Sequence, residues 1–293
     1  MQKNAPAEIV AWFTLFILSL IWGSSFILIK KALIAFEPAV VGTLRLVISG
    51  MVFIPVLVVT RKNIDWKKWP IFAAVGLTGT GIPAYMYAIA QTEISSSVSG
   101  LLNSMTPIFT LLLGLIFFNG LFSKFKLAGV LLGFSGAASL LLLSKESAIG
   151  GKPLYGLLVV VGTMCYGTSV NMVKRYFQDV NPIQISAVSF GFVAIPATFF
   201  LFFSSFFTQL KTESHALFSL GAVALLSIMG TVAASIIFFK LVQNTNAVFA
   251  STVAYLMPVV ALGWGMVDGE IISIFHLFSL ILILTGVYLI KKE

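Results

Sequence analysis

The chain has 293 residues, of which 59% are hydrophobic and only 10% are charged, and its mean hydropathy is +1.04. A soluble globular domain carries about 25% charged residues, so this composition excludes an ordinary soluble protein and indicates lipid as the main solvent. The net charge of +8 comes from short basic clusters between apolar runs, where Lys and Arg orient helices in a membrane, and we therefore predict no nucleic-acid partner.

The apolar runs are continuous and about 20 residues long, which is the length of an α-helix that crosses a bilayer. We predict an all-α integral membrane protein with ten transmembrane helices, at residues 9–30, 38–60, 69–91, 95–118, 125–144, 154–175, 182–207, 216–242, 246–267 and 273–290. The first run continues to Lys30 and lacks a small-residue cleavage site, so we interpret it as a retained helix rather than a signal peptide.

The connections between the predicted spans are short, and the longest polar ones are residues 61–68, 145–152 and 208–215. With the N-terminus inside, eleven Lys and Arg residues fall on the cytoplasmic side and five on the opposite side. Because cytoplasmic loops carry the excess of positive charge, we predict that both termini are cytoplasmic.

The chain also repeats itself. The tetrapeptide W-G-S-S at 22–25 matches Y-G-T-S at 166–169, Lys30-Lys31 matches Lys174-Arg175, E-P at 37–38 matches N-P at 181–182, Pro107 matches Pro258, and Gly136 matches Gly286. Five matches in the same order predict a duplicated five-helix unit, with repeats at residues 1–148 and 149–293. An odd number of spans inserts the second copy upside down, and inverted repeats are typical of secondary transporters.

Several short motifs lie in order along the chain: W-G-S-S-F at 22–26, Pro38 followed by Leu44-Arg45, M-T-P at 105–107, L-M-P at 256–258, and a glycine near the end of spans five and ten. In these motifs the whole chain resembles the EamA-type transporters of the drug/metabolite transporter superfamily. The resemblance implies ten helices around a central cavity and export of amino acids, related metabolites or drugs across a bacterial inner membrane. The family often has an acidic residue after the fourth and ninth helices; Glu270 fits this pattern, whereas Asn119 departs from it.

Span four carries polar residues at helical spacing. Ser99, Asn103 and Pro107 share one helical face, and Pro107 has no N–H to bond the carbonyl of Asn103. We predict that this face, with a free carbonyl beside an amide side chain, lines the substrate path, the alternative being close packing of small residues. Span nine repeats the pattern more weakly with Ser251, Pro258 and the adjacent Tyr255.

Other spans supply further candidates for the path: Trp22, Arg45, Tyr85, Tyr87 and Asn171. Trp22 belongs to the repeated tetrapeptide, for which a packing contact between the repeats is the alternative. For both tyrosines, lining a cavity and packing between helices are equally weighted alternatives. Arg45 is the clear cation inside a span, and such residues are functional candidates by default. It can attract a carboxylate-bearing solute, or pair with Glu37 or a helix C-terminal carbonyl.

The sequence favours transport over catalysis. Motifs of the H-E-x-x-H, D-x-x-D and G-x-S-x-G types are absent, so we predict no enzyme, no catalytic residue, no metal and no cofactor. The leading hypothesis is a monomeric carrier that exports amino acids or related amphipathic solutes by alternating access, with the bilayer and its small-molecule substrate as partners. The alternatives are an intramembrane enzyme acting on a lipid, or a nucleotide-sugar or drug carrier.

Overall fold

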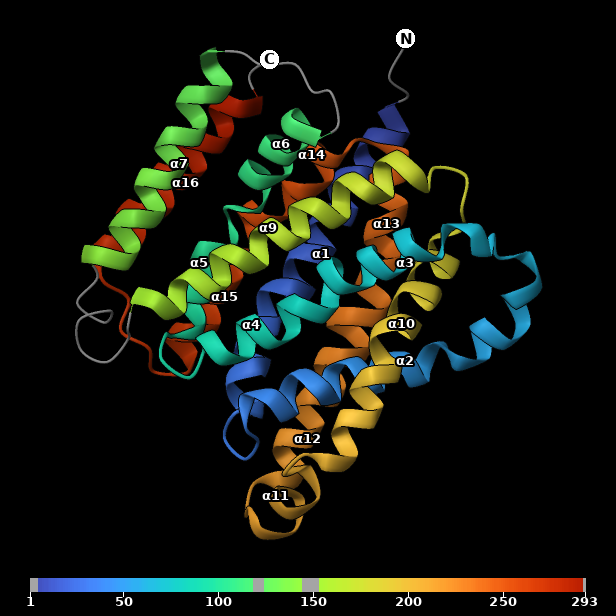
Figure 1. Cartoon of the computed structure of the whole chain (residues 1–293). Coiled ribbons are helices and arrows are strands. Elements are labelled where there is room, and N and C mark those ends of the chain that lie inside the picture. The colour runs from blue at the N-terminus through green and yellow to red at the C-terminus, as the bar shows by residue number, and fades with distance from the viewer. Residues whose placement is uncertain (1–4, 118–123, 144–152, 292–293) are drawn as a thin grey trace.

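The computed structural model describes residues 5–117, 124–143 and 153–291, and every regular element within them is helical (Figure 1). The elements are α1 (Ala5–Ala32), α2 (Pro38–Thr60), η1 (Arg61–Asn63), η2 (Trp66–Lys68), α3 (Trp69–Gly76), η3 (Leu77–Gly81), α4 (Ile82–Ala90), α5 (Ser96–Asn103), α6 (Thr106–Phe117), α7 (Lys124–Leu143), α9 (Pro153–Tyr176), α10 (Pro182–Phe203), α11 (Phe206–Thr212), α12 (Ala216–Leu225), η4 (Leu226–Ala233), α13 (Ala234–Asn244), α14 (Ala247–Ser251), α15 (Val253–Val267) and α16 (Ile274–Lys291). The expected boundary between repeats, at 148/149, and Asn119 lie outside the described residues.

The helices have the length and composition of membrane spans. Eight helical segments of the described chain are long and apolar enough to cross a bilayer, and they correspond to spans one to four and six to nine of the prediction. The two remaining predicted spans coincide with α7 and α16, whose apolar stretches are shorter, at Leu127–Ser139 and Ile274–Gly286. The outside of the bundle exposes large apolar side chains such as Ile195 and Phe199, as expected where lipid is the solvent.

Local sequence determines where several helices begin. Pro38 and Pro182 stand in the first turns of α2 and α10, where a missing N–H costs no helical hydrogen bond. The side chain of Asn181 caps α10 by accepting from the N–H of Ile183. Ser95 caps α5 in the same way through the N–H of Val98. These side chains satisfy N–H groups that would otherwise lack partners at a helix start.

Four of the described spans are interrupted along their length. The third contains the wide π-helical turn η3, which precedes Pro83, and the eighth contains a second one, η4. The fourth span breaks between α5 and α6, and the ninth between α14 and α15. Because a π turn or a break exposes backbone groups, such interruptions are common where a helix contributes to a functional site.

Helix pairs from the two halves of the chain pack against each other: α1 against α15, α2 against α10, and α7 against α16. Figure 1 shows α7 and α16 side by side at the edge of the bundle. Their contact is close because a Cβ on Gly286 would lie 2.5 Å from the carbonyl oxygen of Gly129. Glycine at this position lets the two backbones approach.

One predicted boundary is wrong. Span seven was expected to run to residue 207 and to be followed by a polar connection, but α10 ends at Phe203 and the short helix α11 occupies most of that connection. Ser204 has an extended backbone, and its hydroxyl donates to the carbonyl of Leu201 and accepts from the N–H of Phe206. This local hydrogen bonding competes with the helix and ends it.

Candidate functional site

A cavity lies in the interior of the bundle. Its empty volume, including the open space at its mouth, is about 840 Å³. Residues from both halves of the chain surround it. Its aromatic side chains are Trp22, Phe26, Tyr87, Tyr166, Phe238 and Phe239, and its polar side chains are Ser25, Arg45, Thr80, Asn103, Thr106, Ser169, Thr231, Ser235 and Ser251. None of the described residues that line it is acidic. The described lining therefore combines apolar walls with one charged side chain, that of Arg45.

The aromatic walls contain two separate series of ring contacts. Trp22 meets Phe238 edge to face with ring centroids 4.9 Å apart, and its Nε1–H donates to the carbonyl of Gly230 in η4 at 2.7 Å. Tyr87 lies between Phe26 and Tyr166, with centroids 5.9 Å from each. Rings held by several contacts present a rigid apolar surface, which binds an apolar or aromatic group with little loss of side-chain entropy.

Arg45 extends from α2 into this apolar surround. Its side chain is 8% exposed, and its Nε–H donates to the hydroxyl of Thr231 in η4 at 2.8 Å. The hydroxyl of Tyr166 also interacts with the guanidinium. Within the described residues no carboxylate lies in ion-pair distance of Arg45, and Glu37, a partner considered from the sequence, instead accepts a hydrogen bond from Ser205.

Asn103 lies where α5 ends. Its Oδ1 accepts from the hydroxyl of Tyr87 at 2.5 Å, and its Nδ2 faces the sulfur of Met257 at 3.5 Å. The expectation of a free Asn103 carbonyl is wrong, because the hydroxyl of Thr106 donates to it at 2.8 Å. A threonine one residue before Pro107 thus satisfies the carbonyl that the proline cannot bond. The cavity receives the amide side chain rather than an open backbone group.

The repeated tetrapeptide serves both packing and the cavity. A Cβ on Gly23 would lie 2.5 Å from the Cβ of Val260, and one on Gly167 would lie 2.8 Å from the backbone nitrogen of Thr110. These glycines therefore allow α1 to approach α15 and α9 to approach α6. Next to them, the first and last residues of both tetrapeptides line the cavity: Trp22 and Ser25, and Tyr166 and Ser169.

The structure brings five of the predicted path residues together in the cavity lining: Trp22, Arg45, Tyr87, Asn103 and Ser251. The others, Ser99, Pro107, Tyr85, Asn171, Tyr255 and Pro258, are not part of that lining. Tyr85 shares a hydrogen bond with Thr43 on α2, at 3.0 Å. Asn171 donates to the carbonyls of Thr110 and Gly167, both at 2.8 Å, so it ties α9 to α6.

Sequence reasoning missed Tyr166, Ser169, Thr231 and the pair Phe238 and Phe239. A sequence signal existed for Tyr166 and Ser169, since the repeat aligns them with Trp22 and Ser25. Phe238 and Phe239 lie in an apolar run in which nothing distinguishes a cavity side from a lipid side. Ser169 is 2% exposed and its hydroxyl has no hydrogen-bond partner, which leaves one polar group of the wall unsatisfied.

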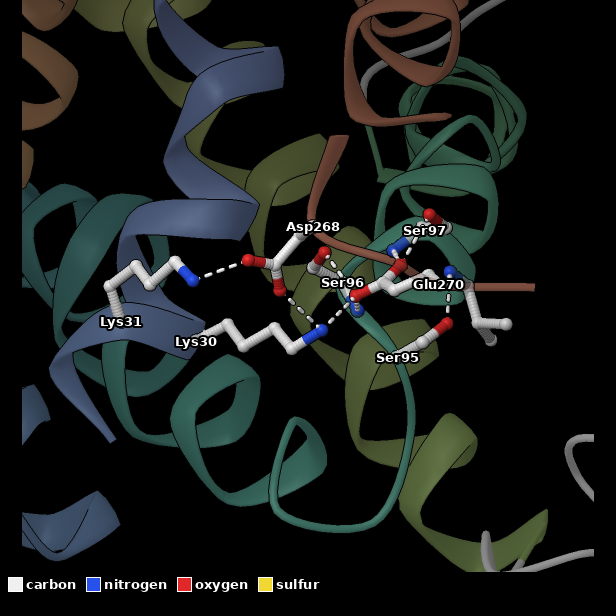
Figure 2. A network of polar contacts seen from close by, with 8 residues as sticks. Lys30, Lys31, Ser95, Ser96, Ser97, Asp268 and Glu270 are labelled. Atoms are coloured by element: carbon white, nitrogen blue, oxygen red, sulfur yellow. Dashed lines mark hydrogen bonds and ion pairs between the residues drawn. The ribbon is translucent and has the colours of Figure 1, made fainter. Parts of the chain in front are cut away.

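A cluster of charges, which we call the clamp, lies beyond the cavity at the end of α1 and consists of Lys30, Lys31, Asp268 and Glu270. Lys30 Nζ lies 2.7 Å from Asp268 Oδ2 and 2.7 Å from Glu270 Oε1, and Lys31 also pairs with Asp268. Figure 2 shows both lysine side chains extending from α1 toward the carboxylates of the segment that follows α15. The clamp joins residues about 240 positions apart in sequence.

Glu270 also caps the start of α5. Its Oε1 accepts from the N–H and hydroxyl of Ser96 at 3.1 and 2.7 Å, and its Oε2 accepts from the N–H and hydroxyl of Ser97 at 3.0 and 2.5 Å (Figure 2). A carboxylate at a helix start is favoured by the free N–H groups and by the helix dipole. The clamp therefore ties α1, α5 and the α15–α16 connection together.

Both acidic groups of the clamp stay ionised because their donors outweigh their burial. Burial opposes the charge of Glu270, but hydrogen bonds from Lys30, Ser97 and Ser96 hold its pKa below the usual range. Burial likewise opposes the charge of Asp268, and hydrogen bonds from Lys30 and Lys31 lower its pKa. The clamp thus keeps its two negative charges at neutral pH.

The far end of the bundle is tied differently. Lys174, which the repeat relates to Lys30, donates from the end of α9 to the backbone carbonyls of Val242, Gln243 and Thr245. The side chain of Gln243 in turn donates to the carbonyl of Phe177, at 2.5 Å. Cations at a helix C-terminus satisfy carbonyls that have no helical partner. No ion pair of the described residues occurs at this end.

A model of the EamA-like transporter family matches residues 9–142 of the chain and, a second time, residues 154–291. The chain belongs to this EamA-like family. Its multiple apolar helices and its transporter relatives identify it as a multi-pass membrane protein with a transporter role. The resemblance inferred from the sequence motifs is confirmed.

The chain is similar to other EamA-like proteins over nearly its full length. An uncharacterized transporter of Archaeoglobus fulgidus is 25% identical over 96% of this chain and 99% of its own length. The uncharacterized inner membrane transporter YedA of Escherichia coli K12 is 24% identical, with 95% and 92% covered. The S-adenosylmethionine/S-adenosylhomocysteine transporter of Chlamydia muridarum is 24% identical, with 99% and 94% covered. A protein of known crystal structure, 18% identical, shares the fold with a TM-score of 0.62 over 96% of both chains.

Proposed function

We propose that this EamA-like protein is a secondary transporter that exports small amphipathic metabolites, amino acids first among them, by alternating access. The observation that carries the proposal is the cavity, with its aromatic walls, the amide of Asn103, and Arg45 as the single cation among its described lining residues. A cavity of this kind suits a solute with an apolar body and a polar end. Trp22, Arg45, Tyr87, Asn103 and Ser251 are the residues of the predicted path that contact the solute in this proposal.

Alternating access requires two states, each open to one side of the membrane. In this proposal the two inverted repeats, residues 1–148 and 149–293, provide these two states. Two matches of one family model support the duplication, as do paired interruptions in spans three and eight and in spans four and nine. In the proposed cycle, ten helices form two inverted units around the cavity. The clamp closes the outer end, and the contacts of Lys174 close the cytoplasmic end.

The proposed location is a bacterial inner membrane with both termini in the cytoplasm. The start of α1 and the end of α16 lie at the same end of the bundle in Figure 1, which supports a common side for the termini. The protein acts as a monomer in this proposal, with the bilayer and the solute as its partners and no role for nucleic acid. Because proton pumps need a carboxylate or histidine relay within the membrane, and no described lining residue is acidic or a histidine, the proposed transport is facilitated export or exchange rather than proton pumping.

The relative from Chlamydia muridarum makes S-adenosylmethionine a second candidate solute. It combines an amino-acid end with an aromatic base, so it has the two chemical features that the cavity offers. A drug or nucleotide-sugar carrier and an intramembrane enzyme acting on a lipid remain the rival functions. A nucleotide sugar carries two phosphate charges, for which Arg45 is the single cation among the described cavity residues.

The test is flux into and out of proteoliposomes loaded with labelled amino acids, S-adenosylmethionine, nucleosides or nucleotide sugars. We expect saturable amino-acid flux that falls at least about tenfold in Asn103→Leu, because the substitution removes the cavity amide and leaves the Tyr87 hydroxyl unpaired. Asn63→Leu is the matched control, since Asn63 is exposed in η1. Flux of nucleotide sugars alone, or chemical conversion of a lipid, would overturn the proposal.

A further inference from the structure

Among the described residues, no acidic side chain lines the cavity to balance the charge of Arg45. Its two described partners, the hydroxyls of Thr231 and Tyr166, are neutral, and none of the described acidic residues lies in ion-pair distance. A buried guanidinium without an anion is costly, and the cost is relieved when an anion enters. The cavity is therefore built for a solute that brings a negative charge.

The geometry of the group favours a carboxylate. A guanidinium presents planar pairs of N–H donors that match the two oxygens of a carboxylate or a phosphate. Arg45 is the single cation among the described lining residues, so it balances the one negative charge of a carboxylate and leaves a doubly charged phosphate group unbalanced. Thr231 holds Arg45 at Nε, on one edge of that plane, and the η4 turn positions Thr231 through a hydrogen bond to the carbonyl of Leu226 at 3.4 Å. The unpaired hydroxyl of Ser169 lies in the same cavity wall and supplies a neutral donor.

The rest of the cavity specifies the body of the solute. Trp22, Phe26, Phe238 and Phe239 offer ring faces and edges, whereas no described lining residue offers a carboxylate to a solute ammonium. An aromatic group gains from these walls through burial and ring contacts. An amino group finds no ion-pair partner there, so the cavity does not require one.

From this arrangement we infer that the transported class is aromatic carboxylates, that Arg45 binds the carboxylate, and that an amino group on the solute is dispensable. This inference rests on the proposed function and narrows it. It places zwitterionic aromatic amino acids and the corresponding amine-free acids in one class. It separates both from amides and esters, which keep the aromatic body and lack the negative charge.

Binding of three matched probes to the purified full chain in lipid nanodiscs at pH 7 tests the inference. The probes are phenylalanine, phenylpyruvate and phenylalaninamide, and the measurement is isothermal titration calorimetry. We expect the first two to bind and the amide to bind about 10- to 100-fold more weakly, as expected for the loss of a charge-assisted hydrogen-bond pair. In Arg45→Gln the acids should lose this advantage, and Arg45→Lys should retain part of it.

Arg175→Gln is the matched control, because Arg175 is exposed at the end of α9. Equal binding of all three probes by the wild-type chain overturns the inference, whether or not Arg45→Gln folds. A folded Arg45→Gln that still prefers the acids overturns it as well. If no probe binds, the inference fails, and flux of other solutes in proteoliposomes then shows independently whether the proposed function stands.

Discussion

Replacing Glu270 with glutamine is the sharpest test of the clamp as a gate. The substitution keeps the shape of the side chain but removes its charge and turns one of its two acceptor oxygens into a donor. Five donors now converge on that carboxylate: the N–H and hydroxyl groups of Ser96 and Ser97, and Lys30 Nζ. In Glu270→Gln at least one of these groups loses its acceptor, and the cap of α5 loses its charge.

A hydrogen bond to a charged group contributes about 1.5–3 kcal/mol. Because the side chain of Glu270 is only 5% exposed, water can replace little of a hydrogen bond that is lost there. We take about 2 kcal/mol as the loss specific to the clamped state. Since each 1.4 kcal/mol changes an equilibrium tenfold, the population with the clamp open should rise about 30-fold.

The assay is labelling of a cavity cysteine by a membrane-impermeant maleimide added from the predicted outer side. Cys165→Ala removes the native thiol, and Ser25→Cys places the reporter in the cavity wall. Glu270→Gln should label about 10- to 30-fold faster. Glu213→Gln is the control, because Glu213 is exposed beside the C-terminus of α11. An unchanged rate in folded Glu270→Gln, or equal acceleration in the control, would refute the gate.

Three further outcomes are expected. Gly76→Ala should lower the melting temperature through a loss of about 1–3 kcal/mol, because its Cβ would lie 2.1 Å from the carbonyl oxygen of Ser189; Gly221→Ala, with open space around it, should have no such effect in the same thermal-shift assay. Tyr87→Phe should cost about 1 kcal/mol in that assay and weaken solute binding in calorimetry, since it removes a buried hydrogen bond. Because the pKa of Glu270 is lowered in the folded state, its ionised side chain stabilises the fold fully above the ordinary glutamate pKa of about 4.3. This stabilisation is lost as the pH falls through the folded-state pKa. The melting temperature should therefore fall below about pH 4, and it should fall less in Glu270→Gln.

Part of the site was accessible from sequence because a polar group in a membrane helix is costly and therefore conspicuous. Arg45 and Asn103 stood out in this way, whereas Trp22 stood out through the repeated tetrapeptide, and all three line the cavity. The same reasoning selected Asn171 and Tyr255, which the structure places in contacts between helices: Asn171 bonds carbonyls of α6 and α9, and Tyr255 packs beside the apolar cluster around Ile283. The amide of Asn171 is satisfied by these carbonyls, whereas the hydroxyl of Tyr255 has no hydrogen-bond partner among the described residues. The residue type alone therefore does not distinguish a cavity residue from one that lies between helices.

The sequence by itself determined the helical membrane class, the order of the spans and the family, because a bilayer admits long apolar helices whose length and composition are local properties. Only the tertiary structure decided which side of each helix faces the cavity. Lipid and cavity walls are both apolar here, so hydropathy does not report how a helix is rotated, and Phe238 resembles any lipid-facing residue of its run. The pairings of Arg45 with Thr231 and of Lys30 with Glu270 join residues 186 and 240 positions apart, and they exist because packed helices bring their sites together.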